Sequence, residues 1–259
     1  MAKNKDSIQY IFTVAFAVCL VCAIIVATSA VVLRPLQVKN KEIDLKRNIL
    51  SAAGLLDEGK TVEEQITQIE TRLVNIETGE FSTEFDIDLF DPIKAASDAS
   101  ITKVLDKKND PASIKRRESF TEVYIVRDDS GDLDTIILPV RGYGLWSTLW
   151  GFIALEEDLN TVVGLGFYSH TETPGLGGEV DNPNWIAQWP GKKVYVEDEA
   201  VIALKKGSVN PDNAFEADHL IDGLSGATLT SKGVTNLVQY WLGDDGFKPF
   251  LDNLKAGGA

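Results

Sequence analysis

The longest apolar run of the chain lies near its N-terminus and predicts a membrane-spanning helix. No charged residue occurs from Ser7 to Leu33. As a helix, the 24 residues 10–33 would be about 36 Å long, against roughly 30 Å of hydrocarbon in a bilayer. A secretory signal peptide is the alternative, but its apolar region usually spans only about 7–15 residues. We therefore expect a short tail at residues 1–9 and an uncleaved transmembrane helix at 10–33.

After this span, the apolar spacing predicts two further helices. The first covers residues 41–56. The second begins at the sequence Thr-Val-Glu-Glu at 61–64, which has the form of a capping box, and continues to about Ile76. Its apolar positions, three and four residues apart, are Val62, Ile66, Ile69 and Leu73. The two helices are expected to pack as a pair, so that residues 34–115 form a juxtamembrane helical region.

The pattern changes to strands in the next segment. Residues 121–127 and 134–140 are rich in β-branched positions and flank the turn sequence Asp-Asp-Ser-Gly, which predicts a hairpin. Further strands are expected at 147–154 and 161–168, with a polar turn between them. Helices follow this meander, so we expect an α+β fold over residues 116–259, an antiparallel sheet flanked by helices.

Thr228 stands at the start of the clearest of these later helices. From Thr230 to Leu242 the apolar residues recur at spacings of three and four. The unpaired N–H groups and the dipole of a helix N-terminus favour an anion, and Gly226 and Ala227 let the anion approach the backbone. The alternative is a plain Ser/Thr helix cap, which is far commoner than an anion site.

Charge and cysteine content limit the possible partners and cofactors. The net charge of −14 argues against nucleic acid, which needs a basic surface. Both cysteines, Cys19 and Cys22, lie in the predicted span on one helix face. They could complete a metal site only with ligands from partner chains, and otherwise they are small apolar residues in a membrane helix.

The sequence Asp-x-x-Ser-Gly-Ala-Thr-x-Thr-Ser at residues 222–231 resembles the signature of covalently flavinylated FMN-binding domains. The resemblance implies that the Thr228 hydroxyl is esterified to the 5′-phosphate of FMN by a separate flavin transferase. Ser225, Gly226 and Ala227 would form the turn beneath the phosphate. A threonine hydroxyl is a weak nucleophile and needs such assistance to attack phosphorus.

Two further motifs resemble the same family, in the same order. They are Gly-Tyr-Gly-Leu-Trp at 142–146 and His-Thr-Glu-Thr-Pro-Gly-Leu-Gly at 170–177. The second is expected to lie beside the flavin, where Glu172 accepts a hydrogen bond from a ring N–H or pairs with a lysine. Trp146 is either an apolar contact for the ring or an ordinary core aromatic, and Lys206 either screens the phosphate or lies in a solvated turn. The complete set of expected cofactor-binding residues is Trp146, Glu172, Thr173, Gly175, Leu176, Gly177, Lys206, Ser225, Gly226, Ala227 and Thr230.

Over its whole length the chain is similar to the C subunits of sodium-translocating NADH:quinone reductases. This resemblance implies a one-electron FMN carrier with no NADH or quinone site and no catalytic residue of its own. It also implies other membrane subunits as partners and a location in the bacterial inner membrane. The large domain would then be periplasmic, although Lys and Arg are more frequent after the span than before it and the positive-inside rule favours the opposite orientation.

Two alternatives remain at this point. The homologous flavoproteins that form the G subunits of Rnf electron-transport complexes share the domain, the anchor and the threonyl flavin. The other alternative belongs to a different class: a membrane-tethered binding or scaffold module, in which Ser-Gly-Ala-Thr caps a helix and no flavin is held.

Overall fold

The computed structural model describes residues 7–257, and their contacts divide the chain between Asp44 and Leu45. The long helix α1, Ile8–Ala52, begins in the first unit and contributes its last turns to the second. Among the described residues it is the one helix long and apolar enough to cross a membrane. Residues 1–6 of the predicted tail lie outside the described part, whereas Ile8 and Gln9 are already helical.

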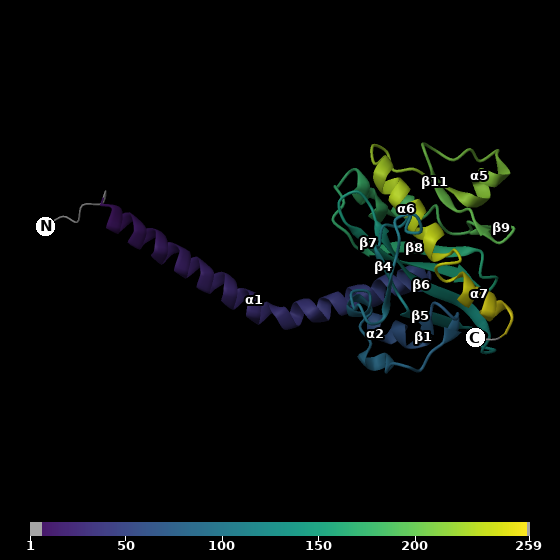
Figure 1. The fold of residues 1–259 in the computed structure, drawn as a ribbon, viewed down its shortest axis with the longest axis horizontal. Coiled ribbons are helices and arrows are strands. Elements are labelled where there is room, and N and C mark those ends of the chain that lie inside the picture. The colour runs from purple at the N-terminus through teal and green to yellow at the C-terminus, as the bar shows by residue number, and fades with distance from the viewer. Residues whose placement is uncertain (1–6, 258–259) are drawn as a thin grey trace. The chain divides into compact units, whose positions relative to one another are not determined.

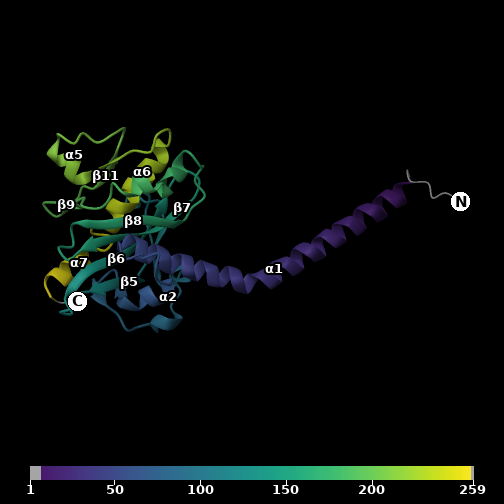
Figure 2. The same cartoon turned by 180° about the vertical axis from the view of Figure 1, so that it is seen from behind.

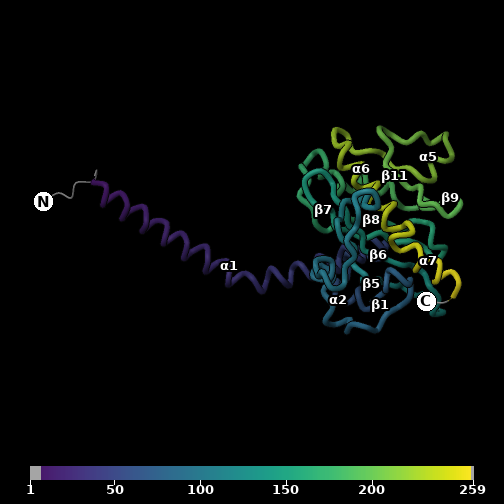
Figure 3. Tube along the Cα trace, viewed as in Figure 1, coloured from purple at the N-terminus to yellow at the C-terminus, as the bar shows by residue number. Residues whose placement is uncertain are grey.

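The second unit is built on a six-stranded antiparallel sheet in the order β2-β1-β5-β6-β7-β8 (Figure 1). Four of its strands form the predicted meander, which the Cα trace in Figure 3 follows from β5 to β8. The strand bounds are β1 Ile69–Asn75, β2 Glu80–Phe81, β5 Phe120–Arg127, β6 Leu133–Tyr143, β7 Thr148–Glu156 and β8 Val162–Ser169. The predictions of the hairpin, the meander and the α+β class are thus confirmed.

Shorter elements surround this sheet. In the described part of the chain, three small two-stranded sheets pair β3 with β4, β9 with β10, and, in parallel, β11 with β12. These strands are β3 Thr102–Val104, β4 Arg116–Glu118, β9 Tyr195–Val196, β10 Glu199–Ala200, β11 Ala203–Lys205 and β12 Leu220–Asp222. The remaining helices and helical turns are α2 Val62–Gln65, η1 Ile66–Gln68, η2 Ile87–Leu89, α3 Pro92–Ala95, η3 Gly177–Asp181, α4 Pro183–Ile186, α5 Ala214–His219, α6 Thr228–Trp241 and α7 Lys248–Lys255.

Each face of the sheet is covered by a different part of the chain. Helix α6 packs against β6 on one face, as Figures 1 and 2 show from opposite sides. Its apolar side joins the main core, and a side chain at Gly142 would collide with Leu237. The end of α1 covers the other face, where a Cβ on Gly164 would lie 2.6 Å from the carbonyl oxygen of Ala52. The sheet therefore holds α6 and its N-terminus in a fixed position.

The helices predicted between residues 41 and 76 are partly wrong. Residues 41–52 continue α1 without a break, instead of forming a separate helix. The capping box at Thr61 is present, but helical structure ends at Gln68 and β1 follows. Residues 69–75 pair along their whole length with β5, so strand pairing outweighs the helical spacing of their apolar residues. The expected helix pair is therefore absent from the described structure, and the region 34–115 is not the helical region that the sequence predicts.

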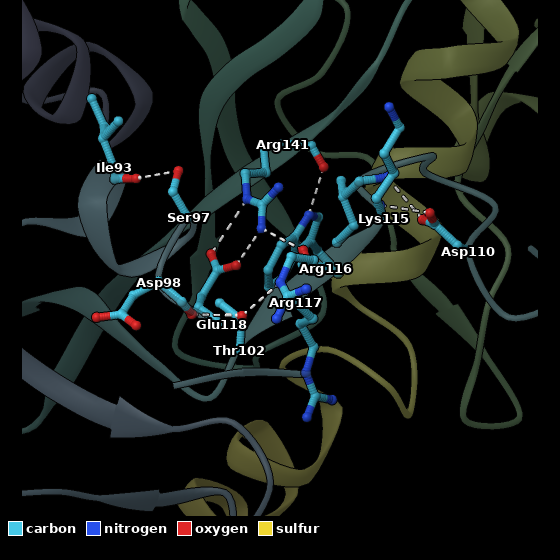
Figure 4. A network of polar contacts seen from close by, with 12 residues as sticks. Ile93, Ser97, Asp98, Thr102, Asp110, Lys115, Arg116, Arg117, Glu118 and Arg141 are labelled. Atoms are coloured by element: carbon cyan, nitrogen blue, oxygen red, sulfur yellow. Dashed lines mark hydrogen bonds and ion pairs between the residues drawn. The ribbon is translucent and has the colours of Figure 1, made fainter. Parts of the chain in front are cut away.

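A buried ion pair ties β4 to the main sheet (Figure 4). The guanidinium of Arg141, on β6, contacts the carboxylate of Glu118 and donates a 2.8 Å hydrogen bond to the carbonyl oxygen of Arg116. The same guanidinium lies 5.2 Å from the ring centroid of Trp150. Because both charged side chains are only 8% exposed, each depends on the other for compensation of its charge.

Candidate functional site

Helix α6 begins at Thr228, as the sequence predicts, and its first turn has free hydrogen-bond donors. The N-cap residue is Ala227, which supplies no side-chain acceptor. Within residues 7–257, the backbone N–H groups of Thr228, Leu229 and Thr230 donate to no acceptor. Thr228 is exposed and lies inside the helix, so it does not serve as the Ser/Thr cap considered as its alternative role. This helix start combines a positive dipole end with open donors, which is a suitable environment for a phosphate.

The turn before α6 is held by hydrogen bonds and by a glycine in a left-handed conformation. Gly226 has φ +71°, and a Cβ at this residue would lie 3.0 Å from Leu176 Cδ2. The Ser231 hydroxyl accepts from the N–H of Leu224 and donates to the carbonyl oxygen of Ala227. Ser225 and Gly226 remain exposed. The turn thus leaves the backbone open beside Thr228, a conformation that a side chain at Gly226 would oppose.

A cavity of about 300 Å³ adjoins Thr228. Three lysines line it: Lys205 and Lys206 from the β11 side, and Lys232 from the next turn of α6. The ammonium of Lys205 pairs with Glu216 at 2.5 Å, whereas Lys206 and Lys232 make no ion pair within the described part of the chain. The cavity is large enough to take part of a flavin nucleotide, and its exposed ammonium groups suit a phosphate.

Glu172 lies beneath this region and joins three chain segments. Its Oε1 accepts from the backbone N–H groups of Leu145, Trp146 and Ser147 at 3.1, 2.9 and 3.2 Å. Its Oε2 accepts from the Thr230 hydroxyl at 2.7 Å. Burial alone would raise the pKa of Glu172, but these hydrogen bonds, led by that from Thr230, outweigh it and lower the pKa. Within residues 7–257 no lysine pairs with Glu172, and a hydrogen bond from a ring N–H to its carboxylate stays a prediction.

Large apolar side chains are exposed around the start of α6. Trp146 is 64% exposed, Leu229 58% and Leu176 43%, and Leu145 and Tyr143 are also exposed. Three separate segments contribute these residues, and the close contacts at Gly226 and Glu172 bring the segments together. An exposed cluster of this kind marks a binding surface more often than isolated apolar residues do. It offers an aromatic ring an apolar surface beside Thr228.

The other expected residues shape the 172–178 loop. The carbonyl oxygen of Thr173 accepts from Leu176 and Gly178, and Gly175 turns the chain at φ +75°. Gly177 packs against Glu172 and Thr230, where a Cβ would lie 2.5 Å from the Thr230 hydroxyl. The sequence interpretation did not identify Lys232 or Leu229 as site residues. Lys232 follows Thr228 by four residues, a spacing that places both on one side of a helix and could have indicated it. Leu229 directly follows Thr228, and its position in the first turn of the helix could have indicated it.

The cysteines occupy a different part of the chain. Cys19 and Cys22 are exposed on α1, in the first unit. Within residues 7–257 no group of three or more His, Cys, Asp or Glu side chains is placed to hold a metal ion. A metal site that uses partner chains stays a prediction.

Comparison with known proteins assigns the chain to a family. A family model described as "FMN-binding domain" matches residues 144–243, the part that contains Glu172 and Thr228. Among the C subunits of Na(+)-translocating NADH-quinone reductases, that of Pseudomonas aeruginosa is 51% identical over 261 residues, 99% of each chain. That of Pasteurella multocida is 45% identical and covers 99% of this chain and 98% of its own. The chain belongs to the family of these C subunits.

Solved structures agree with this assignment. The crystal structure of Shewanella oneidensis NqrC has a TM-score of 0.76 and 34% identity, and covers 85% of this chain and 99% of its own. The structure of the corresponding reductase chain from Parabacteroides distasonis has a TM-score of 0.63 and 30% identity, with 85% and 96% coverage. As a member of this family, the chain is a component of an enzyme complex, and the assignment favours the reductase over the Rnf alternative.

Proposed function

We propose that this chain carries electrons, one at a time, on an FMN joined through its 5′-phosphate to the hydroxyl of Thr228. The observation that carries the proposal is the exposed Thr228 at the uncapped start of α6, beside open N–H donors. The FMN-binding match and the names of the relatives support the cofactor and the complex. The chain acts as the flavin electron carrier of a sodium-translocating NADH-quinone reductase.

Attachment is the formation of one phosphoester. The Thr228 oxygen bonds to the flavin phosphorus, the bond from that phosphorus to the leaving-group oxygen of the flavin donor breaks, and the hydroxyl proton is released with the leaving group. The chain thereby gains the mass of FMN less water. Because an unactivated hydroxyl attacks phosphorus slowly, a separate flavin transferase supplies the activation. Thr228 needs to be reachable by that enzyme, and its exposure supports this.

Different residues around Thr228 bind the phosphate and the ring of the nucleotide. The N–H groups of the first turn of α6 and the ammonium groups of Lys206 and Lys232 hold the phosphate. Trp146 and Leu176 give the flavin ring an apolar surface. Bound FMN supplies reversible electron uptake. A covalent link keeps the cofactor on a carrier that receives and passes on electrons repeatedly.

We also propose where the chain is located. The apolar part of α1 crosses the bacterial inner membrane, and the domain that follows lies in the periplasm among other subunits of the complex. Local charge favours the reverse orientation, but the rule is weak for long translocated domains. An introduced Ser130→Cys, in the exposed β5–β6 turn, tests this. An impermeant thiol reagent should label it in intact spheroplasts, whereas labelling only after lysis would place the domain in the cytoplasm.

Intact mass of the chain, purified after expression with the transferase, tests the attachment. The native chain and Thr228→Ser should carry the added mass of FMN less water, and Thr228→Val should lack it. Fluorescence should stay with the denatured chain only in the first two. Ser130→Ala is the matched control, because it removes an exposed hydroxyl of the β5–β6 turn, outside the site, and should leave the mass increase in place. An unmodified native chain would reject covalent attachment and favour the scaffold alternative.

A further inference from the structure

Among residues 7–257, Glu172 is a buried carboxylate without a cationic partner. The residue is 5% exposed, and no Lys, Arg or His side chain in the described part of the chain pairs with it. Its charge is compensated by dipoles alone: three backbone N–H groups and the Thr230 hydroxyl. Such hydrogen bonds stabilise the ionised form and leave its net charge of −1 in place.

This carboxylate is enclosed by backbone on two further sides. A Cβ on Gly144 would lie 2.7 Å from Glu172 Oε1, and a Cβ on Gly177 would lie 2.7 Å from Oε2. Helix α6 is equally close to the same turn, because a Cβ on Gly233 would lie 2.5 Å from the carbonyl oxygen of Tyr143. Three segments therefore meet closely at one carboxylate: the turn at 144–147, the loop at 172–178 and the start of α6.

The meeting point lies next to the proposed flavin position. Thr230, whose hydroxyl donates to Glu172 Oε2, is two residues after Thr228 on the same helix. Trp146 donates its backbone N–H to Glu172 Oε1, and its side chain is the most exposed of the apolar cluster. Glu172 thus contributes no apolar surface of its own to that cluster, but fixes the backbone that presents it.

We propose that Glu172 is a positioning residue of the flavin site, which braces the 144–147 turn against α6 and whose negative charge lowers the flavin's reduction potential. The inference rests on the proposed function. An electron added to a bound flavin without a proton adds one negative charge, and a fixed negative charge nearby opposes this addition. Burial makes the opposition stronger, because a charge shielded from water is screened less.

Two substitutions separate the brace from the charge. In Glu172→Gln, the amide oxygen still accepts from the 145–147 N–H groups and the amide nitrogen can donate to the Thr230 hydroxyl, so the brace stays and the charge is lost. In Glu172→Ala both are lost. Glu179→Gln is the matched control, since it neutralises a half-buried carboxylate that follows the same loop and bonds only the Asn182 side chain among the described residues.

The experiment uses the full flavin-loaded chain in detergent and two readouts that need no enzyme activity. Spectroelectrochemical titration should show about a tenfold higher ratio of reduced to oxidised flavin at a fixed potential in Glu172→Gln, and less than about a twofold change in Glu179→Gln. Hydrogen exchange of the Trp146 and Ser147 amides should stay slow in Glu172→Gln and become at least about tenfold faster in Glu172→Ala.

Each failure has a distinct meaning. A wild-type chain without flavin would overturn both the proposed function and this inference. Flavin-loaded Glu172→Gln with an unchanged ratio of reduced to oxidised flavin would overturn the inference and leave the attachment intact. Slow amide exchange at Trp146 and Ser147 in Glu172→Ala would also overturn it, because the brace would then come from other contacts.

Discussion

The hydroxyl of Thr230 donates to the carboxylate of Glu172 across 2.7 Å, although 58 residues separate the two along the chain. This bond joins the helix that carries Thr228 to the loop that follows β8. It gives a Glu in the loop motif a structural role that the local sequence does not reveal.

The unfolding free energy should depend on pH through the ionisation of Glu172. Burial opposes ionisation of this carboxyl group, but the hydrogen bonds dominate and lower its pKa in the folded chain. The resulting stabilisation is fully present above the ordinary glutamate pKa of about 4.3 and is lost as the pH falls through the lower folded-state pKa. The difference in unfolding free energy between wild type and Glu172→Gln, measured in urea, should therefore shrink below about pH 4. A difference that grows on acidification would contradict the assignment.

The Gly177→Ala substitution should separate Thr230 from Glu172. Its Cβ would lie 2.5 Å from the Thr230 hydroxyl, on a fully buried, β-branched side chain with little freedom to move. We expect a loss of about 1–3 kcal/mol of stability in urea unfolding. The control is Gly175→Ala, because a Cβ at Gly175 would meet no other atom. It should lose only about 1 kcal/mol of stability, from the strain of an alanine in the left-handed conformation. Equal losses would show that the close contact at Gly177 is relieved without strain.

The buried pair of Arg141 and Glu118 should be sensitive to removal of one partner. Arg141→Met leaves the Glu118 carboxylate uncompensated, so we expect a loss of about 3–5 kcal/mol. The double variant Arg141→Met/Glu118→Leu should recover much of that loss, because neither charge then stays buried. Urea unfolding of the two single variants and the double variant completes the cycle. If the loss of unfolding free energy in the double variant equals the sum of the losses in the two single variants, these residues are not coupled.

Flavin attachment should depend on the lysines of the cavity beside Thr228. We expect Lys206→Ala/Lys232→Ala to slow attachment roughly three- to tenfold, since each exposed charge contributes at most about 1 kcal/mol. Intact mass at timed intervals after addition of transferase and flavin substrate measures the rate. Lys103→Ala removes an exposed lysine of β3 that does not line the cavity and should attach flavin at the wild-type rate. If the double variant attaches flavin at the wild-type rate, the two lysines do not contribute to the site.

The sequence predicts the meander and the start of α6 because their signals are local. The Asp-Asp-Ser-Gly turn between β5 and β6 and the apolar spacing of α6 each lie within a few neighbouring residues. The spacing of Ile69 and Leu73 is equally regular but gives a strand, since β5 provides a partner for every residue of β1. That partner is distant in sequence, so no local pattern reveals it.

The candidate site shows the same limit. The sequence identifies Thr228 as a candidate through its motif and its position at a helix start. The role of Glu172 depends on donors from two other segments, the turn at 145–147 and helix α6. Lys232 follows Thr228 by one helical turn, but its relevance becomes clear only with the cavity that both line. Sequence patterns identify residues that act within one element, and they cannot identify residues whose partners come from elsewhere.

The pairing of β1 with β5 also bears on the order in which the domain folds. Strands β5 to β8 are joined by short connections and close small loops, while β1 pairs Asn75 with Phe120 across a long intervening segment. Loop closure is slower for distant partners. We therefore expect the meander to assemble first and β1 to pair with β5 after it. During synthesis β1 is made before β5, so we expect it to stay unpaired until β5 is available, and the sheet to be completed in the direction of the N-terminus.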